Sequence, residues 1–327
     1  MLRVAVAGAG FMGRTHAPRW AGLPQVAVVG VYSRRAATAQ TVAEAVGAAA
    51  TTDLDELLAL DADVLDICLP TDRHADVALR AFEAGRHVVC EKPIALDPAD
   101  GQRMIAAAAR SGRLLLLAHV VRFWPEYAAL RDLLAQGAIG RPTSAAAARL
   151  QEGSGWSLDG GAVRAQSGGP VIDLQIHDHD YLAWLFGVPR QVGAVGGDRH
   201  VFTSYAFDGG VAATAEAASD MPAGYPFTSA IRVRGEEGVL EYVFRAGGVR
   251  PDEPGGESRL LLHRPGHAPQ AVAVEPGDPY TLQIAHFAEC LRQGRPSPVI
   301  PPEAAVRALR VALAARAALD GGTPVRP

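Results

Sequence analysis

The stretch LRVAVAGAGFMG at residues 2–13 decides the fold of the first part of the chain. Its first six residues form a nearly continuous apolar run, which is typical of a buried parallel strand. Glycines follow at once in G-x-G-x-x-G spacing, which permits a tight turn and lets the N–H groups of the next helix approach a pyrophosphate. We therefore predict a dinucleotide-binding turn; a glycine turn that serves packing alone is the alternative. The turn residues are Gly8, Gly10, Phe11, Met12 and Gly13.

Strand and helix patterns continue to alternate up to about residue 122. Apolar runs at residues 26–32, 64–69, 87–90 and 114–119 alternate with helical segments at residues 11–21, 36–46, 54–60, 74–84 and 98–111. Near-continuous apolar strands separated by helices predict a parallel sheet that is covered on both faces. We expect an α/β fold, with a Rossmann dinucleotide-binding domain over residues 1–122.

The pattern changes after this point. A helix is expected at residues 126–136, a strand at 143–150, a loop rich in glycine and serine at 151–169, and a helix at 171–186. About seven strand candidates, joined by tight turns, follow between residues 190 and 274, and two helices close the chain. Strands joined by tight turns predict antiparallel pairing. Residues 123–327 are therefore expected to form an α+β domain with a large, mainly antiparallel open sheet.

Composition and charge exclude several classes of protein. The 327 residues carry 31 Lys and Arg against 35 Asp and Glu, which gives no general electrostatic reason to bind nucleic acid or an anionic membrane. The three cysteines form no C-x-x-C pair, which fits a reducing compartment and no cysteine-rich zinc module. The longest apolar stretch is interrupted by Arg110 and Arg113, and the N-terminus resembles no signal peptide. We expect a cytoplasmic protein.

The end of the second predicted strand bears on the choice of cofactor. NAD-binding turns of this kind carry a carboxylate there, which binds the ribose hydroxyls. This chain has Tyr32-Ser33-Arg34-Arg35 instead. Ser33 can donate to a 2′-phosphate and Arg34 can form charge-assisted hydrogen bonds with it, which favours NADP over NAD. The alternative is a solvated basic turn that accepts either cofactor.

Glu91-Lys92-Pro93 follows a predicted strand at the carboxyl edge of the sheet, where ligands of such folds bind. An ammonium group there can polarise a substrate oxygen and stabilise a developing alkoxide. The alternative for Lys92 is an exposed lysine in a turn. The sequence leaves the isomer of the bond before Pro93 open.

A second candidate constellation lies in the helix expected at residues 171–186. A helix would place Asp173 and His177 one turn apart on the same face. An aspartate beside a histidine can orient the imidazole for general-base catalysis. Two alternatives are a capped helix with surface charges and a catalytic zinc site, although His177 and His179 would point to nearly opposite sides of the helix. No metal is expected.

Two further residues are candidate substrate contacts. His119 ends a predicted strand near the presumed site, and a structural histidine is the alternative. Trp156 lies in the loop before the second constellation and can stack on a sugar ring; a loop anchor is the alternative.

These motifs together resemble one family over essentially the whole chain: the glucose-fructose oxidoreductase/inositol dehydrogenase/rhizopine-catabolism (GFO/IDH/MocA) oxidoreductases. The order and spacing of the motifs are specific. They are the glycine turn with His16 after it, LPTDRH at residues 69–74, AGRHVVCEKPIA at 84–95, Arg122-Phe123, GAIG at 137–140, and GGPVIDLQIHDHD at 168–180.

The resemblance implies an NAD(P)-dependent dehydrogenase or reductase of a sugar or cyclic polyol. Lys92 matches the family's catalytic lysine, and Asp173 and His177 match its substrate-site aspartate and histidine. In this mechanism His177 takes the hydroxyl proton, Lys92 stabilises the oxygen, and Asp173 orients His177 or binds a neighbouring hydroxyl.

The resemblance also implies how the cofactor and the subunits bind. Pro70, Thr71, His74, Glu91 and Arg122 match positions that usually line the cofactor. The family's large C-terminal sheet commonly packs against a second subunit, which predicts a homodimer or homotetramer. Two other activities known among such folds are a redox-neutral NAD-dependent glycoside hydrolase and a dinucleotide-binding regulator without turnover.

Overall fold

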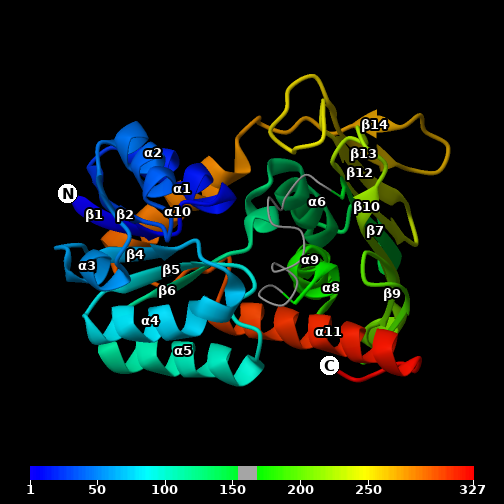
Figure 1. Cartoon of the computed structure of the whole chain (residues 1–327). Helices are drawn as coiled ribbons and strands as arrows, with labels where there is room; N and C mark the ends of the chain where they lie inside the picture. The colour runs from blue at the N-terminus through cyan, green and yellow to red at the C-terminus, as the bar shows by residue number, and fades with distance from the viewer. Residues whose placement is uncertain (154–167) are drawn as a thin grey trace. The chain divides into compact units, whose positions relative to one another are not determined.

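The structure, a computed structural model, describes residues 1–153 and 168–327 (Figure 1). The chain divides into two compact units. The first comprises Met1–Phe123 and Gly277–Val306, and the second comprises Trp124–Pro276 and Arg307–Pro327. The sequence pattern places residues 277–306 with the second half of the chain, whereas the structure packs this segment into the first unit.

The first unit is built on a parallel sheet in the order β3-β2-β1-β4-β5-β6. This is the Rossmann order, and it confirms the predicted α/β fold. The sequence did not indicate β3, because three small residues at a sheet edge form no apolar run. The strands are β1 (Leu2–Ala7), β2 (Val26–Tyr32), β3 (Ala49–Thr51), β4 (Val64–Ile67), β5 (His87–Glu91) and β6 (Leu115–Ala118).

Helices cover both faces of this sheet. The pair α4 and α5 lies on one face, and α1, α2 and α10 lie on the other (Figure 1). The side chains of Asp53 and Asp97 accept hydrogen bonds at the starts of α3 and α5, as N-cap residues do. The helical segments are α1 (Phe11–Ala21), α2 (Ala36–Val46), α3 (Leu54–Ala59), η1 (Thr71–Arg73), α4 (His74–Glu83), α5 (Pro98–Ser111), η2 (Val120–Phe123) and α10 (Pro279–Gln293).

The core of the first unit explains why α10 belongs to it. Ile284 and Phe287 of α10 are fully buried in the same cluster as Trp20 of α1 and the strand residues Val4 and Val89. Burial of large apolar side chains is the dominant favourable contribution to folding, so this contact fixes the segment in the first unit.

The second unit contains an eight-stranded sheet in the order β14-β13-β12-β11-β7-β10-β9-β8. All neighbouring strands are antiparallel except β7 and β10, which confirms the prediction of a mainly antiparallel sheet. The strands are β7 (Pro142–Glu152), β8 (Gln191–Gly196), β9 (His200–Ala206), β10 (Ala212–Met221), β11 (Thr228–Gly235), β12 (Val239–Arg245), β13 (Glu257–His263) and β14 (Gln270–Ala271).

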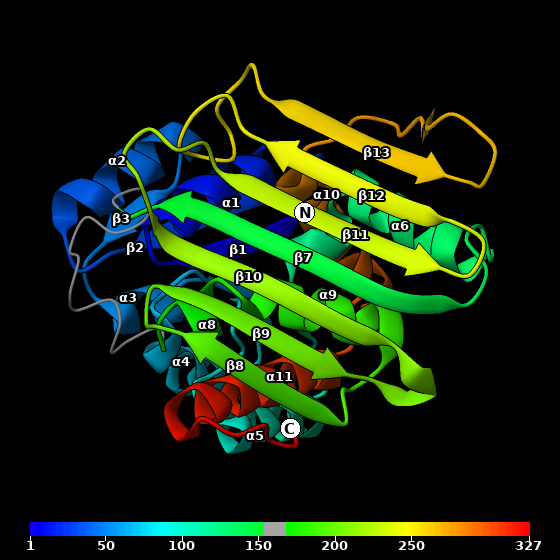
Figure 2. The same cartoon turned by 90° about the vertical axis from the view of Figure 1, so that its right-hand side faces the viewer.

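One face of this sheet packs against helices and the other is open. Buried and partly exposed residues alternate along β7, as they do in a strand with one covered face. Figure 2 shows the open face, with no described helix in front of it. The helical segments that complete the unit are α6 (Pro125–Ala135), α8 (Pro170–Asp173), α9 (Ile176–Phe186), η3 (Asp208–Gly210) and the greater part of α11 (Pro302–Gly321).

The single helix predicted at residues 171–186 is wrong, because the chain forms two helices, α8 and α9. At the break, the N–H of Gln175 donates to the carbonyl oxygen of Pro170, five residues back, which widens the turn. The fully buried Gln175 side chain explains the break. It donates to the Ala215 carbonyl and accepts from the Thr203 hydroxyl, so the sheet holds this residue in place.

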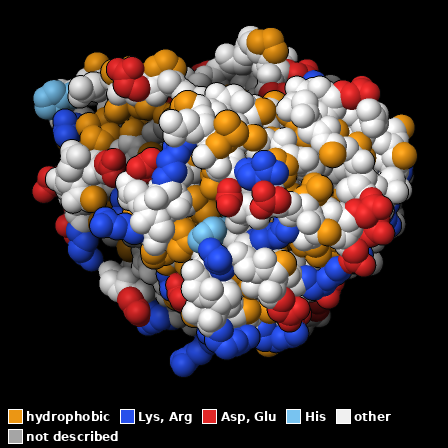
Figure 3. Space-filling view, turned by 90° about the vertical axis from the view of Figure 1, so that its left-hand side faces the viewer, with side chains coloured by type: hydrophobic (Ala, Val, Ile, Leu, Met, Phe, Trp, Pro, Cys, Tyr) orange, Lys and Arg blue, Asp and Glu red, His pale blue; other side chains and the backbone are white. Residues whose placement is uncertain are grey.

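Acidic and basic side chains are interspersed on the face seen in Figure 3, as the near balance of charges in the sequence predicts. No helix in the described parts of the chain combines the length and apolar character needed to cross a membrane.

Candidate active site

The predicted site residues of the first unit follow the carboxyl ends of its parallel strands. Gly8 follows β1, Ser33 follows β2, Pro70 follows β4, Lys92 follows β5, and His119 follows β6. The carboxyl ends of parallel strands meet at one edge of a sheet, so the fold gathers these residues at a single edge.

The three glycines of the first turn differ in whether the structure could accommodate a side chain in their place. Gly8 has a φ of +116°, and a Cβ on it would lie 2.3 Å from the carbonyl oxygen of Cys68. A Cβ on Gly13 would lie 1.8 Å from the carbonyl oxygen of Gly8. A Cβ on Gly10 would meet nothing within 4 Å. Packing therefore explains Gly8 and Gly13 but not Gly10, whose backbone faces open space.

The start of α1 suits an anion. The helix begins at Phe11 after Gly10, with no side-chain cap and no acidic residue in its first turn. The N-terminal end of a helix carries a partial positive charge, and its first N–H groups have no carbonyl partner within the helix. Together with the open space at Gly10, this arrangement fits the pyrophosphate of a dinucleotide.

The residues at the end of β2 lie beside this turn. The N–H of Gly8 donates to the carbonyl of Tyr32 at 3.0 Å, so the following residues, Ser33 and Arg34, are next to the glycines. The Ser33 hydroxyl accepts from the N–H of Arg35 at 3.3 Å, and Arg34 is exposed. Residues 30–38 of the chain include no Asp or Glu, so this strand end keeps the basic character read from the sequence.

The His74 side chain links two loops at the carboxyl edge of the parallel sheet. Its ring nitrogens each lie 2.8 Å from a backbone carbonyl oxygen, Nε2 from Leu69 and Nδ1 from Pro93. Only a charged ring can donate to both, but burial outweighs the two carbonyls and lowers the pKa of His74, so the neutral ring donates to one of them. Pro70 and the buried Thr71 lie in the loop that His74 fixes.

The Glu91-Lys92-Pro93 turn is tied back to its own strand. One oxygen of the buried Glu91 carboxylate, Oε2, accepts from the N–H of Lys92 at 3.2 Å. Lys92 itself is half-buried, and the bond between Lys92 and Pro93 is cis. The hydrogen bond to Glu91 and the partial burial of Lys92 argue against an exposed lysine in a loose turn.

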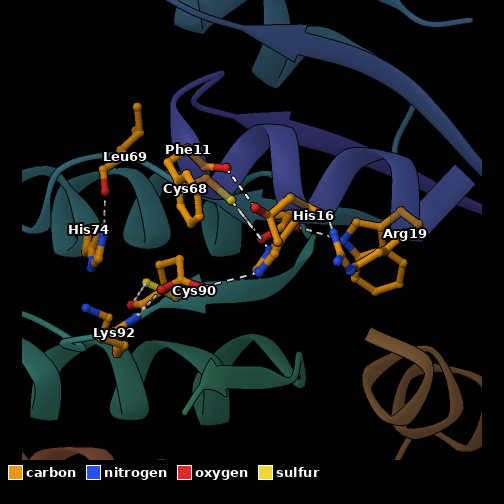
Figure 4. Close-up of polar contacts among 12 residues, drawn as sticks. Phe11, His16, Arg19, Cys68, Leu69, His74, Cys90 and Lys92 are labelled. Carbon is orange, nitrogen blue, oxygen red and sulfur yellow. Dashed lines mark hydrogen bonds and ion pairs between the residues drawn. The ribbon is translucent and has the colours of Figure 1, made fainter. Parts of the chain in front are cut away.

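The other oxygen of Glu91 belongs to a buried cluster that sequence reasoning missed. The ring of His16 lies between two carboxylates, with Nε2 3.3 Å from Oε1 of Glu91 and Nδ1 2.9 Å from Oδ2 of Asp66. The indole N–H of Trp20 donates to Asp66 at 2.8 Å, and the thiol of Cys68 lies 3.5 Å from Nδ1 of His16. In Figure 4, dashed lines run from His16 toward Cys68 and toward the strand that carries Cys90 and Lys92.

The cluster controls the protonation of its members. Burial alone lowers the pKa of His16, but Asp66 and Cys68 together outweigh it and hold this pKa well above its usual value. Burial, followed by the charge of Asp66, raises the pKa of Cys68 to about 12. His16 is therefore charged and Cys68 is a neutral thiol at ordinary pH. The signal for this cluster in the sequence is Asp66, a carboxylate within the otherwise apolar run of β4.

Within the described residues, one group brings three potential metal ligands together: His16, Asp66 and Cys68. Hydrogen bonds among these side chains account for their proximity.

His119 and Arg122 follow β6 and are buried. The Arg122 guanidinium donates to the Val299 carbonyl at 2.7 Å.

In the second unit, Asp173 ends α8 and His177 lies in the first turn of α9. Both side chains are partly accessible. The break between the helices corrects the expectation that Asp173 and His177 stack one turn apart on one continuous helix. Trp156 lies outside the described residues.

A buried polar layer holds α9 against the sheet. The guanidinium of Arg149 on β7 makes two hydrogen bonds with the Asp178 carboxylate, at 2.9 and 3.2 Å. The ring nitrogens of His179 lie 3.2 Å from the Val171 carbonyl and 2.8 Å from the Tyr205 hydroxyl. Because both nitrogens of His179 are occupied, this residue has no nitrogen left to share a zinc ion with His177. Asp178 and His179, the two residues after the partly accessible His177, thus anchor the start of α9.

Family models match most of the chain. Residues 2–119 match the oxidoreductase family with an NAD-binding Rossmann fold, GFO/IDH/MocA, and residues 127–241 match the GFO/IDH/MocA C-terminal domain. The chain resembles the solved UDP-N-acetylglucosamine 3-dehydrogenase of Acidithiobacillus ferrooxidans with a TM-score of 0.81 and 26% identity, over 98% of both chains.

Characterised relatives include two sugar oxidoreductases. A dTDP-3,4-didehydro-2,6-dideoxy-alpha-D-glucose 3-reductase of Streptomyces violaceoruber is 30% identical over 89% of this chain and 86% of that protein. The D-glucoside 3-dehydrogenase of Escherichia coli is 35% identical over 58% of this chain, a match that spans 55% of that enzyme. The two matching domain models, together with the near full-length sequence match to the reductase, make this chain a member of the GFO/IDH/MocA oxidoreductase family.

Proposed function

We propose that the protein is an NAD(P)-dependent dehydrogenase or reductase of a sugar or cyclic polyol. The observation that carries the proposal is the open backbone at Gly10, at the uncapped start of α1, in a chain whose relatives are named as sugar oxidoreductases. A bound nicotinamide would accept or donate the hydride. The residues of the chain would bind the substrate oxygen and move its proton.

In the oxidative direction, the C–H bond would break with transfer of a hydride to the nicotinamide. The hydroxyl proton would pass to a basic ring nitrogen of His177 as the carbon–oxygen double bond forms. The ammonium of Lys92 stabilises the negative charge on the oxygen during this change. Asp173 orients His177 or binds a neighbouring hydroxyl.

Composition supports a specific role for Lys92. It is the only lysine in the chain, whereas the other 30 of the 31 basic residues are arginines. Where a positive charge alone is needed, this sequence uses arginine. A compact ammonium with three donors differs chemically from a planar guanidinium, so the exception at position 92 supports a role for the amine itself.

We further propose NADP as the preferred cofactor, with Ser33 and Arg34 at its 2′-phosphate, because this strand end carries no carboxylate. The cofactor would also contact the turn residues Gly8, Gly10, Phe11, Met12 and Gly13, together with Pro70, Thr71, His74, Glu91 and Arg122. His119 and Trp156 are the proposed additional substrate contacts.

The open face of the second unit's sheet is the proposed subunit interface. Val195 and Phe202 are cross-strand neighbours there, 68% and 48% exposed, and small side chains such as Ala146 and Ala148 lie on the same face of β7. An exposed apolar patch of this kind suits a protein partner, and we propose a homodimer or homotetramer. Light scattering should show a smaller species for Phe202→Asp than for the unmodified protein; an unchanged mass would reject this face.

The test of function is a redox assay with NADP or NAD and a panel of aldoses, anhydro-sugars, nucleotide sugars and inositols. Formation of reduced nicotinamide should fall roughly 100-fold or more in Lys92→Ala. Lys92→Arg keeps the charge and should also lose most of the activity, because a guanidinium does not reproduce the position of the amine.

Other outcomes would replace the proposal. Cleavage of a nitrophenyl glycoside with no net cofactor reduction would identify a redox-neutral hydrolase. Tight dinucleotide binding without turnover of any sugar would favour a regulator. Arg34→Ala with unchanged NADP affinity would reject the preference for NADP.

A further inference from the structure

The buried cluster around His16 lies directly behind the turn that carries Lys92. His16 comes from α1, Asp66 from β4 and Glu91 from β5, so three separate elements meet at one imidazole ring. His16 is fully buried and Asp66 is fully buried. A charged ring and two carboxylates at this depth are costly unless each satisfies the others.

The two ring nitrogens of His16 contact the carboxylates in different ways. Nδ1 lies 2.9 Å from Oδ2 of Asp66 in hydrogen-bonding geometry, whereas Nε2 lies 3.3 Å from Oε1 of Glu91 as an ion-pair contact without a hydrogen bond. A charged ring, with a proton on both nitrogens, is attracted to both carboxylates. A neutral ring would present a lone pair to one of the two carboxylates and would leave two buried negative charges without a cation between them.

Hydrogen bonds hold the Asp66 carboxylate in place beside His16. The indole N–H of Trp20 donates to the same oxygen, Oδ2, that faces His16, and the thiol of Cys68 lies 3.7 Å from the other oxygen. Glu91 connects His16 to Lys92, because its Oε1 faces His16 and its Oε2 accepts a hydrogen bond from the backbone N–H of Lys92.

We propose that His16, held by Asp66, is a positioning residue that fixes the Glu91 carboxylate and thereby the backbone of Lys92 at the end of β5. This inference deepens the proposed function and rests on it, because it assigns a purpose to the cluster only if Lys92 acts on the substrate. Loss of the charge on His16 releases Glu91 from one side, and the amide of Lys92 loses its fixed acceptor.

The alternative is that the cluster only ties α1 to the sheet. Both roles predict some loss of stability on mutation, so stability does not separate them. The position and titration of the Lys92 amine do separate them, because a purely structural tie between α1 and β4 does not act on that amine.

The single lysine makes this measurement direct. Reductive methylation with ¹³C-formaldehyde labels only Lys92 and the N-terminal amine, and NMR then follows the titration of each signal. The variants are His16→Gln and Asp66→Asn. The matched control is His263→Gln, which removes another histidine near a carboxylate, 3.6 Å from Glu241, in the second unit.

We expect the Lys92 signal to change its chemical shift and titration midpoint in His16→Gln and Asp66→Asn, and to stay unchanged in the control. In the redox assay, the same two variants should lose roughly 10- to 100-fold in kcat, as small misplacements of catalytic groups do. An unchanged Lys92 signal with unchanged kcat in both variants overturns the inference.

The pH profile adds a readout that a structural role would not move. The groups that face His16 are Asp66 on β4, Cys68 just after β4, Glu91 on β5, and Tyr280 on α10. Deprotonation of His16 should lower kcat at high pH, and Asp66→Asn should shift this fall to lower pH. A uniform decrease in kcat without a shift rejects the positioning role.

Two further observations keep the test decisive. If the variants do not fold, ¹⁵N-histidine labelling of the unmodified protein reports the His16 ring, identified by its contact to the Trp20 indole; a neutral ring at pH 7 overturns the inference. If Lys92→Ala retains full activity, the proposed role of Lys92 fails. If Lys92→Ala is inactive while His16→Gln is fully active, only the positioning role fails.

Discussion

Two buried histidines, one in each unit, show how strongly the neighbours of an imidazole ring affect its pKa. Both His16 and His179 are almost inaccessible, and both have a polar neighbour within 3.3 Å of each ring nitrogen. His16 faces two carboxylates, and its pKa is held well above the usual value despite burial. His179 faces a carbonyl and the Tyr205 hydroxyl, and burial lowers its pKa to about 3. Burial favours the neutral ring in both, and at His16 the neighbouring Asp66 and Cys68, with Asp66 contributing most, reverse this effect.

The buried polar clusters around His16 in the first unit and around Asp178 in the second unit also differ in which side chain carries the positive charge. The first uses the titratable ring of His16, whereas the second uses the guanidinium of Arg149 beside Asp178. Burial opposes the charge on Arg149, but Asp178 outweighs it and raises the pKa of the guanidinium. The first region therefore responds to pH in the range where proteins are studied, and the charge on Arg149 does not.

The largest effect is expected in the second region. Arg149→Met leaves the Asp178 carboxylate buried and unpaired, which should lower the free energy of unfolding by about 3–5 kcal/mol. Urea unfolding at pH 7 measures this. The double variant Arg149→Met/Asp178→Leu is the control and should recover much of the loss; a single variant as stable as the unmodified protein would show that the pair is not needed.

The second largest effect is expected on stability at acidic pH. His179 is neutral in the folded protein, whereas the unfolded chain binds a proton below about pH 6.5. The unfolded state therefore binds more protons between pH 6.5 and 3, and stability should fall by about 1.4 kcal/mol for each unit of pH below 6. His179→Gln should reduce this slope. An identical slope in both proteins would contradict the assignment.

The opposite sign is expected for His16. Its raised pKa means that the folded protein binds the proton more tightly, so its contribution to stability is complete below about pH 6.5. Above that pH the contribution should decrease by about 1.4 kcal/mol for each further unit of pH, until the pH passes the pKa of the folded protein. Urea unfolding of the unmodified protein and of His16→Gln from pH 6 to 10 tests this, and a rise in stability attributable to His16 over that range would be incompatible with it.

The smallest effect is expected where an ion pair lies at the surface. Nη1 of Arg103 is 2.8 Å from Oδ1 of Asp100 on α5, and the two side chains are 64% and 39% exposed. Exposed ion pairs contribute about 0–1 kcal/mol, so Arg103→Gln should change the free energy of unfolding by less than about 0.5 kcal/mol at pH 7. A loss as large as that of a buried pair would remove burial as the explanation for the contrast.

Several features of the site were predictable because they depend on neighbours in sequence. The glycine turn follows β1 directly, and the Glu91-Lys92-Pro93 turn follows β5, so a strand pattern and a short motif suffice to place them. The parallel order of the first sheet follows from the alternation of strands and helices. The break at Gln175 was not predictable, because the partners that hold its side chain lie on β9 and β10.

The sequence by itself determined the two kinds of sheet, the glycine turn after β1, the strand-end position of Lys92 and the family. Each is encoded in local periodicity or in a contiguous motif. Only the tertiary structure decided that α10 joins the first unit, that α8 and α9 separate, and that His16, Asp66 and Glu91 share one buried cluster. These depend on contacts between residues far apart in the chain, where burial and charge, and not local propensity, fix the outcome.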